Sequence, residues 1–212
     1  IVVAGEGAFG RKHLEALRNI ENIEVVSLAG GVESATGDVA KDFGIPHWSL
    51  DLSECLSQPG VEAAILVTPT PMHAAQAMQV LDAGKHVFVE IPMADNIEDS
   101  RALAAKVEAT ELTAMVGHVR RFNPPHQWVH NKVIGGELGI QQMDIQTFFF
   151  RRTNVNALGE PRSWTDHLLW HHAAHSIDLF KYQTGEEITE VYAVAGPVNP
   201  DLGIYMDMGI VM

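Results

Sequence analysis

The sequence predicts an α/β protein of two domains, a doubly wound parallel sheet followed by an α+β domain with a mostly antiparallel open sheet. In its first half, short apolar runs alternate with helical patterns, as in βαβ units. A glycine-rich turn joins the first of these runs to the first helical pattern. The alternation stops after Gly117. We therefore expect one domain at residues 1–117 and a second at residues 118–212.

The first domain is predicted from short apolar runs and from residues that end helices. Residues 63–67 are apolar on both faces, which is typical of a central parallel strand. Gly44 and Gly84 follow helical patterns and are suited to end them. We expect strands at 1–4, 24–29, 63–67, 86–90 and 113–117, and helices at 11–19, 34–43, 71–83 and 97–111.

The second domain has longer elements and a different order. Pro124 and Pro125 lie near the start of a helical pattern, where proline is tolerated. We expect helices at 122–134 and 164–183, strands at 139–150, 188–195 and 203–212, and a loop at 154–162. The chain begins inside a strand pattern without Met, and its last residues continue a strand pattern. We therefore expect this domain to be truncated, with more chain beyond Met212.

Charge and composition exclude several kinds of partner. The chain has 27 acidic and 14 basic residues and a net charge of −13, which disfavours nucleic acid and anionic membrane surfaces. No apolar run approaches the roughly 20 residues that span a bilayer, and no signal peptide is evident. Cys55 is the only cysteine, so no intrachain disulfide is possible. We therefore expect a cytoplasmic protein.

The glycine-rich turn is the first candidate binding site. Its sequence, Gly5-Glu6-Gly7-Ala8-Phe9-Gly10, is a G-x-G-x-x-G between a predicted strand and a predicted helix. In such a turn the first glycine allows a tight bend, the second lets the backbone approach a pyrophosphate, and the third lets helix pack on strand. Backbone N–H groups and the helix dipole favour the anion. We expect a dinucleotide to contact Gly5, Gly7, Ala8, Phe9 and Gly10; the alternative is a turn without a ligand.

The end of the second predicted strand bears on the choice between NAD and NADP. An acidic residue there binds the ribose 2′-hydroxyl and repels a 2′-phosphate. This chain has Leu28-Ala29-Gly30-Gly31, and its first acid is Glu33. The sequence leaves room for a phosphate at Gly30, with Ser34 or Thr36 as hydrogen-bond donor, although no Arg is present. We predict NADP, with NAD as the alternative; Gly30-Gly31 as a merely flexible turn is the competing interpretation.

Four further motifs carry a family resemblance. They are Val67-Thr68-Pro69-Thr70-Pro71-Met72-His73, Glu90-Ile91-Pro92, Gly117-His118-Val119-Arg120-Arg121-Phe122 and His175-Ser176-Ile177-Asp178. In this order and spacing the chain resembles the glucose–fructose oxidoreductase, inositol dehydrogenase and MocA family over nearly its whole length. The resemblance implies a Rossmann domain, dimers formed through the open sheet of the second domain, and hydride transfer at a sugar-like carbon.

The same resemblance implies roles for individual residues. Cofactor contacts are implied at the glycine loop and at Thr68 and Glu90, and we add their neighbours Pro69, His73 and Pro92 to the cofactor site. An acid–base role is implied for His175.

Two departures from the family pattern alter the expected substrate. Ile91 stands where the family usually has Lys, and His171 stands where it often has Asp. An ordinary sugar or polyol substrate is therefore in doubt. Residues 148–154 and 161–175 resemble a branch of the family from protocatechuate 4,5-cleavage, whose semialdehyde substrate cyclises to a hemiacetal with two carboxylates. This resemblance implies oxidation of that hemiacetal to a pyrone dicarboxylate.

Arginine side chains suit such a dianionic substrate. Guanidinium groups bind carboxylates through paired, charge-assisted hydrogen bonds. If Arg151 and Arg152 continue a strand, they face opposite ways. Pairing with surface acids is the alternative for each arginine. The candidate substrate-binding residues are Arg121, Arg151, Arg152, Arg162, Trp164 and His167.

A row of histidines supplies a candidate base. His167, His171 and His175 are spaced four residues apart and lie along one face of the predicted helix. Removal of a hydroxyl proton near neutral pH suits imidazole. We predict His175 as general base and His171 as a proton relay or substrate ligand. Asp166 or Asp178 is expected to orient a ring.

Other functions fit parts of the same pattern. Histidines four apart on a helix can bind zinc, but hydride transfer to a nucleotide needs no metal, and we predict none. Histidines satisfied by their neighbours are a further alternative. A sugar or polyol dehydrogenase of the same family is the second functional hypothesis. The third is a non-catalytic NADP-binding regulator, against which His175 and Asp178 argue.

Overall fold

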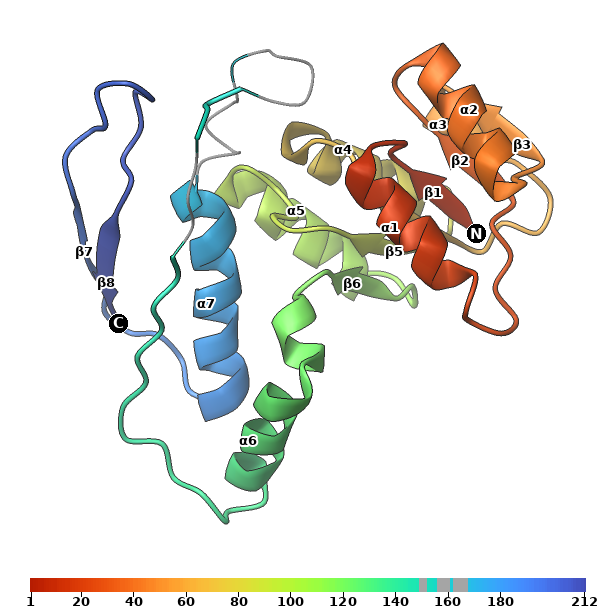
Figure 1. The fold of residues 1–212 in the computed structure, drawn as a ribbon. Helices are drawn as coiled ribbons and strands as arrows, with labels where there is room; N and C mark the ends of the chain where they lie inside the picture. The colour runs from red at the N-terminus through yellow and green to blue at the C-terminus, as the bar shows by residue number, and fades with distance from the viewer. Residues whose placement is uncertain (149–151, 156–160, 162–167) are drawn as a thin grey trace. The chain divides into compact units, whose positions relative to one another are not determined.

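The computed structural model describes residues 1–148, 152–155, 161 and 168–212 (Figure 1). The chain forms two compact units, residues 1–117 and 118–212. Among the described residues, no helix combines the length and apolar character needed to cross a membrane.

The first unit is built on a six-stranded parallel sheet in the order β3-β2-β1-β4-β5-β6. The strand order reverses between β1 and β4, which is the place where ligands bind in open α/β sheets. The predicted doubly wound sheet is thus confirmed. Its strands are β1 (Val2–Ala4), β2 (Ser27–Ala29), β3 (His47–Ser49), β4 (Ala63–Leu66), β5 (His86–Val89) and β6 (Ala114–Val116).

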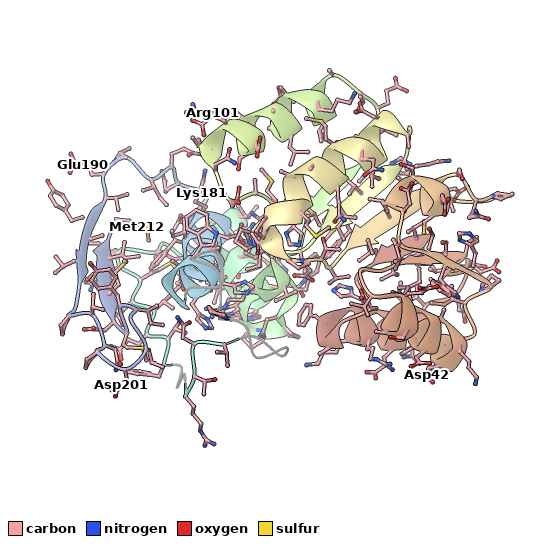
Figure 2. All side chains as sticks on the ribbon, turned by 90° about the horizontal axis from the view of Figure 1, so that it is seen from above. Asp42, Arg101, Lys181, Glu190, Asp201 and Met212 are labelled. Atoms are coloured by element: carbon pink, nitrogen blue, oxygen red, sulfur yellow. The ribbon has the colours of Figure 1, made fainter. Side chains whose placement is uncertain are left out.

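Helices cover both faces of this sheet and bury two apolar clusters against it. Val3, Leu14 and Leu28 are at most 1% exposed and join β1, β2 and the first helix in one of the clusters. At the surface, Asp42 near the end of α2 pairs with Arg11 of α1 (Figure 2). The helices are α1 (Ala8–Leu17), α2 (Glu33–Phe43), α3 (Leu52–Leu56), α4 (Thr70–Asp82) and α5 (Ile97–Glu108).

Two short elements of the first unit were missed by sequence reasoning. β3 consists of His47, Trp48 and Ser49 at the edge of the sheet, and none of the three is buried, so no apolar run marks it in the sequence. α3 has five residues, too few to show a helical repeat. Its start carries a local signal, because the Asp51 carboxylate accepts a hydrogen bond from Ser53 N at 2.8 Å.

In the second unit, one long helix packs on a shorter one. α6 (Pro124–Ile134) follows the 3₁₀ turn η1 (Val119–Phe122), and α7 (Leu168–Thr184) returns beside both. The ring of His130 in α6 stacks on Tyr182 of α7 with centroids 3.9 Å apart. The remaining regular structure described is an antiparallel pair, β7 (Tyr192–Ala195) and β8 (Met208–Val211).

The strand expected at 139–150 is a correction. Its described part, residues 139–148, is assigned no strand. An alternating sequence becomes a strand only when its backbone groups find a neighbouring strand, and in the described part of the chain β7 and β8 pair with each other. Among the described residues of the second unit, the sheet therefore contains fewer strands than expected.

Candidate functional site

The glycine loop has the conformation that its sequence predicts. Gly5 follows β1 with φ +117°, a backbone angle that residues other than glycine rarely adopt. A Cβ on Gly5 would lie 2.6 Å from the carbonyl oxygen of Val67, and one on Gly10 would overlap the Gly5 carbonyl. Both positions therefore need glycine for the close packing of β1, α1 and the end of β4.

Gly7 differs from the other two glycines of the loop. It precedes α1 in an extended conformation, and no side chain caps the helix there. A Cβ on Gly7 would have no atom within 4 Å, so the space above it is not needed for folding. Together with the uncapped N–H groups of the first turn, where Ala8 and the exposed Phe9 lie, this space fits the pyrophosphate of a dinucleotide.

The ends of β4 and β5 are joined through His73. This side chain is 2% exposed; its Nδ1 lies 2.7 Å from Pro92 O and its Nε2 lies 2.6 Å from Thr68 O. The Thr68 hydroxyl donates to Gln76 Oε1 at 2.5 Å, and Pro69 precedes α4. The predicted cofactor residues of these loops are therefore held together by a buried histidine.

Glu90, at the end of β5, has a partner that sequence reasoning missed. His13 of α1 places Nε2 2.8 Å from Glu90 Oε1, and the two side chains are 20% and 11% exposed. Phe9 and Phe88 pack edge-on against the His13 ring. Because His13 and Glu90 are 77 residues apart, no sequence spacing connects them. The pair connects α1 to the carboxyl end of β5, where Glu90 lies.

The turn after β2 corrects the expected phosphate site. Thr36 is fully buried, and its hydroxyl donates to Val32 O at 2.7 Å, so it cannot serve a phosphate. A Cβ on Gly30 would overlap the Thr36 side chain. Gly30 therefore serves packing. Ser34 is exposed in the first turn of α2.

In the second unit, Asp178 of α7 binds residues of η1 and the segment before it. Arg121 donates to Asp178 from Nε, at 2.9 and 3.1 Å, and from Nη2. His118 Nδ1 lies 3.6 Å from Asp178 Oδ2. These hydrogen bonds to the Asp178 carboxylate are the main reason that the pKa of Arg121 is raised. The described contacts give Asp178 and Arg121 a structural role, and their catalytic and substrate roles stay predictions.

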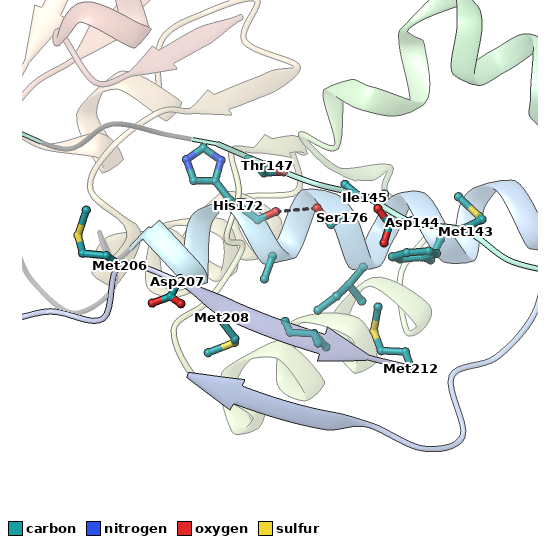
Figure 3. A pocket seen from close by; sticks show the side chains of 14 residues that line it. Met143, Asp144, Ile145, Thr147, His172, Ser176, Met206, Asp207, Met208 and Met212 are labelled. Atoms are coloured by element: carbon teal, nitrogen blue, oxygen red, sulfur yellow. Dashed lines mark hydrogen bonds between the residues drawn. The ribbon is translucent and has the colours of Figure 1, made fainter. Parts of the chain in front are cut away.

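α7 presents different residues to different neighbours. Asp178 and Tyr182 face η1 and α6, and the half-buried His175 falls on the same stripe by its spacing. His172 and Ser176 instead line a cavity of about 220 Å³ beside β8, where Met206 and Met208 lie opposite the helix (Figure 3). His175 and His172 therefore lie on the same helix but have different neighbours, so that substitutions of the two can be compared.

Several predicted site residues lie outside the described residues. They are Arg151, Arg162, Trp164, Asp166 and His167, together with the side chain of His171. Arg152 is exposed. Within the described part of the chain, no three His, Cys, Asp or Glu side chains converge to hold a metal ion.

The strand order, the glycine loop and the open space at Gly7 define a dinucleotide-binding protein. Residues 1–118 match the oxidoreductase family with an NAD-binding Rossmann fold, and residues 124–212 match the C-terminal domain of bacterial oxidoreductases. The chain belongs to this NAD-binding oxidoreductase family.

Individual relatives agree with this assignment. The chain is 57% identical over 210 residues to 4-carboxy-2-hydroxymuconate-6-semialdehyde dehydrogenase of Sphingobium sp. strain SYK-6, covering 99% of this chain and 66% of that protein. The myo-inositol 2-dehydrogenase structure from Lactobacillus plantarum shares the fold, with a TM-score of 0.79 at 17% identity over 99% of this chain and 64% of that one.

A further solved structure holds the cofactor. It is scyllo-inositol dehydrogenase from Lactobacillus casei with bound NAD(H) and scyllo-inositol, which matches with a TM-score of 0.76 at 21% identity over 92% of this chain and 59% of that one. The chain thus spans 59–66% of the length of these three proteins.

Proposed function

We propose that the protein oxidises the cyclic hemiacetal of 4-carboxy-2-hydroxymuconate-6-semialdehyde to 2-pyrone-4,6-dicarboxylate with a nicotinamide dinucleotide, in the catabolism of protocatechuate. The observation that supports this proposal most directly is the 57% identity, over 99% of the chain, to a dehydrogenase named for that semialdehyde. The glycine loop supports the cofactor part of the proposal, because its open side at Gly7 fits a pyrophosphate.

The proposed chemistry needs one hydride acceptor and one base. A bound nicotinamide would supply the hydride acceptor. His175 takes the hydroxyl proton, so that as the C–H and O–H bonds break, the exocyclic C–O bond becomes the carbonyl of the pyrone and the ring C–O bond remains. Asp178 holds Arg121 and His118 beside the same helix stripe. We propose that this pairing positions the helix face that carries His175.

Substrate charge separates this proposal from the sugar or polyol alternative. A substrate with two carboxylates needs cations in a chain of net charge −13. Arg121, Arg151, Arg152 and Arg162, with Trp164 and His167, are the proposed substrate residues. Because Arg121 already binds Asp178, the main substrate contacts are assigned to the other three arginines.

The test is an absorbance assay at the reduced-nicotinamide band with the protocatechuate 4,5-cleavage product, run with NAD and with NADP. We expect reduced cofactor and pyrone dicarboxylate to form in equal amounts, and Arg162→Ala to lose activity. Turnover of inositol with none of the semialdehyde would favour the polyol alternative. Tight cofactor binding without turnover of either substrate would favour a regulator.

The preference between NADP and NAD is a finer part of the proposal. The sequence predicts NADP, but Thr36 is buried and engaged. Ser34 is then the remaining predicted hydroxyl for a 2′-phosphate. The NADP preference therefore rests on Ser34 and on the absence of an acid directly after β2.

Dimerisation and location complete the proposal. The β7–β8 sheet exposes apolar side chains, with Tyr192 70%, Val194 75% and Val211 69% exposed. We propose that this sheet face forms a homodimer interface, because exposed apolar patches of this kind mark association sites. Light scattering is expected to give twice the chain mass; a monomer at all concentrations would oppose it. A cytoplasmic location follows from the single cysteine.

A further inference from the structure

The glycine loop and the turn after β2 are joined by one side chain. Glu6, the residue between the first two glycines, accepts hydrogen bonds at its Oε1 from Gly31 N and from Val32 N, both at 3.0 Å. These contacts link positions 25 and 26 residues apart. Oε2 of Glu6 has no hydrogen-bond partner in the part of the chain that the structure describes.

In this fold, residues of the turn after β2 contact the ribose 2′ position of a bound dinucleotide. The residue that ends β2 is Ala29, and Gly30, Gly31 and Val32 follow, so the usual acid is absent from the strand end. The N–H groups of Gly31 and Val32 are donors of the kind that a phosphate would use. The Glu6 carboxylate occupies both of them.

The charges near the turn also disfavour a phosphate. No Lys or Arg occurs between Arg18 and Lys41 in the sequence. Arg18 donates to the carbonyl of Asp42, and its guanidinium lies over the Phe43 ring at the far end of α2. Glu33 adds a further carboxylate in the first turn of α2. A 2′-phosphate would therefore meet negative charge without a neighbouring cation.

We propose that Glu6 is the residue that selects NAD over NADP. Its Oε1 is fixed by the two backbone amides, its Oε2 accepts a hydrogen bond from the ribose 2′-hydroxyl, and its charge rejects a 2′-phosphate. The glycine loop thus supplies the acid that β2 lacks. This inference rests on the proposed binding of a nicotinamide dinucleotide, and it reverses the NADP preference predicted from the sequence.

The experiment measures the dissociation constants of NAD and NADP by titration calorimetry, so it does not depend on turnover. Unchanged protein is compared with Glu6→Gln, which keeps an amide oxygen for Gly31 N and Val32 N but removes the charge. Glu33→Gln is the matched control, because it removes a nearby exposed charge whose side chain makes no hydrogen bond to Gly31 N or Val32 N. Thermal melting confirms that each variant folds.

For unchanged protein we expect NAD to bind at least about tenfold more tightly than NADP. Glu6→Gln is expected to reduce that ratio by about tenfold, mainly through tighter NADP binding, whereas Glu33→Gln changes it by less than about twofold. Val32→Arg provides a gain-of-function arm, since Val32 is 52% exposed and an Arg there can pair with a phosphate. We expect it to tighten NADP binding.

The outcomes separate this inference from the proposed function. If unchanged protein binds neither dinucleotide, both are overturned. If it binds both and the ratio is the same in Glu6→Gln, or if NADP already binds more tightly, the role of Glu6 is overturned and the dinucleotide site stands. Equal effects of Glu6→Gln and Glu33→Gln would assign selectivity to general charge and overturn the specific role of Glu6.

Discussion

At the scale of single residues, the site combines groups that are distant in sequence and close in space. The pair of His13 and Glu90 illustrates this, because a hydrogen-bond contact between side chains that are 20% and 11% exposed holds α1 against the end of β5. Motif reasoning found Glu90 and did not single out His13. Only the fold reveals that the two act together.

The first prediction concerns this pair. His13→Ala should lower the free energy of unfolding by about 1–3 kcal/mol, because it leaves a nearly buried carboxylate without its partner. His13→Gln restores a donor of similar reach and should recover part of the loss. Urea unfolding followed by circular dichroism measures both. Equal stability of His13→Ala and unchanged protein would show that water replaces the imidazole at no cost.

The second prediction concerns the proposed base. His175→Asn should lower turnover of the hemiacetal by roughly two to four orders of magnitude and leave the dissociation constant of NAD unchanged. His172→Asn is the control, because His172 lies on the same helix but lines the cavity beside β8. A His175→Asn enzyme with near-normal turnover would remove His175 from the mechanism.

At the scale of elements, α7 is held to η1 by one ion pair of unequal partners. Arg121 is 44% exposed and Asp178 is 9% exposed. Loss of the arginine therefore leaves a nearly buried carboxylate without this partner, whereas loss of the aspartate leaves a guanidinium that water can solvate. The two truncations should differ although they break the same contact.

The third prediction follows from that asymmetry. Arg121→Ala should destabilise the second unit by about 1–3 kcal/mol, and Asp178→Ala by no more than about 1 kcal/mol. Thermal melting of both variants and of the double variant gives the coupling between the residues. A larger loss for Asp178→Ala would contradict the burial argument.

The fourth prediction concerns α3, the short helix that sequence reasoning missed. Cys55 in α3 is fully buried, and burial raises the pKa of its thiol. Since the thiolate is the reactive form, a thiol reagent at pH 8 should label the native protein very slowly and the urea-unfolded protein at once. Rapid labelling of native protein would mean that α3 opens readily from the sheet.

The elements also show what a sequence can and cannot reveal. The long helices and central strands of the first unit were predicted, because apolar periodicity and Gly44 mark them. β3 was missed because this edge strand has no buried residue and so no apolar run, and α3 was missed because five residues are too few to show a helical repeat. The prediction of a strand at 139–150 was wrong over residues 139–148, because strand formation depends on a neighbouring strand, which the local pattern does not reveal.

The same limit applies to the candidate site. Gly5, Gly7 and Gly10 were predicted because a motif fixes their roles. The roles of Glu6 and His13 depend on residues that are 25 and 77 positions away, and no spacing rule reaches that far. The prediction of Thr36 as a phosphate ligand was wrong, because Thr36 is buried and that burial becomes evident only once α2 is packed.

At the scale of the whole molecule, the proposed function depends on the first unit holding a dinucleotide at its glycine loop. Family membership implies this, and Gly7 allows a direct test. Gly7 has an extended backbone and free space where a Cβ would be. A side chain at Gly7 should therefore leave the fold intact and fill the place of the pyrophosphate.

The most direct measurement is titration calorimetry of NAD with unchanged protein and with Gly7→Val. We expect melting temperatures within a few degrees of each other and a loss of NAD affinity of at least about tenfold, equivalent to about 1.4 kcal/mol. Equal NAD affinity in a folded Gly7→Val protein would contradict this expectation, because the cofactor would then lie elsewhere.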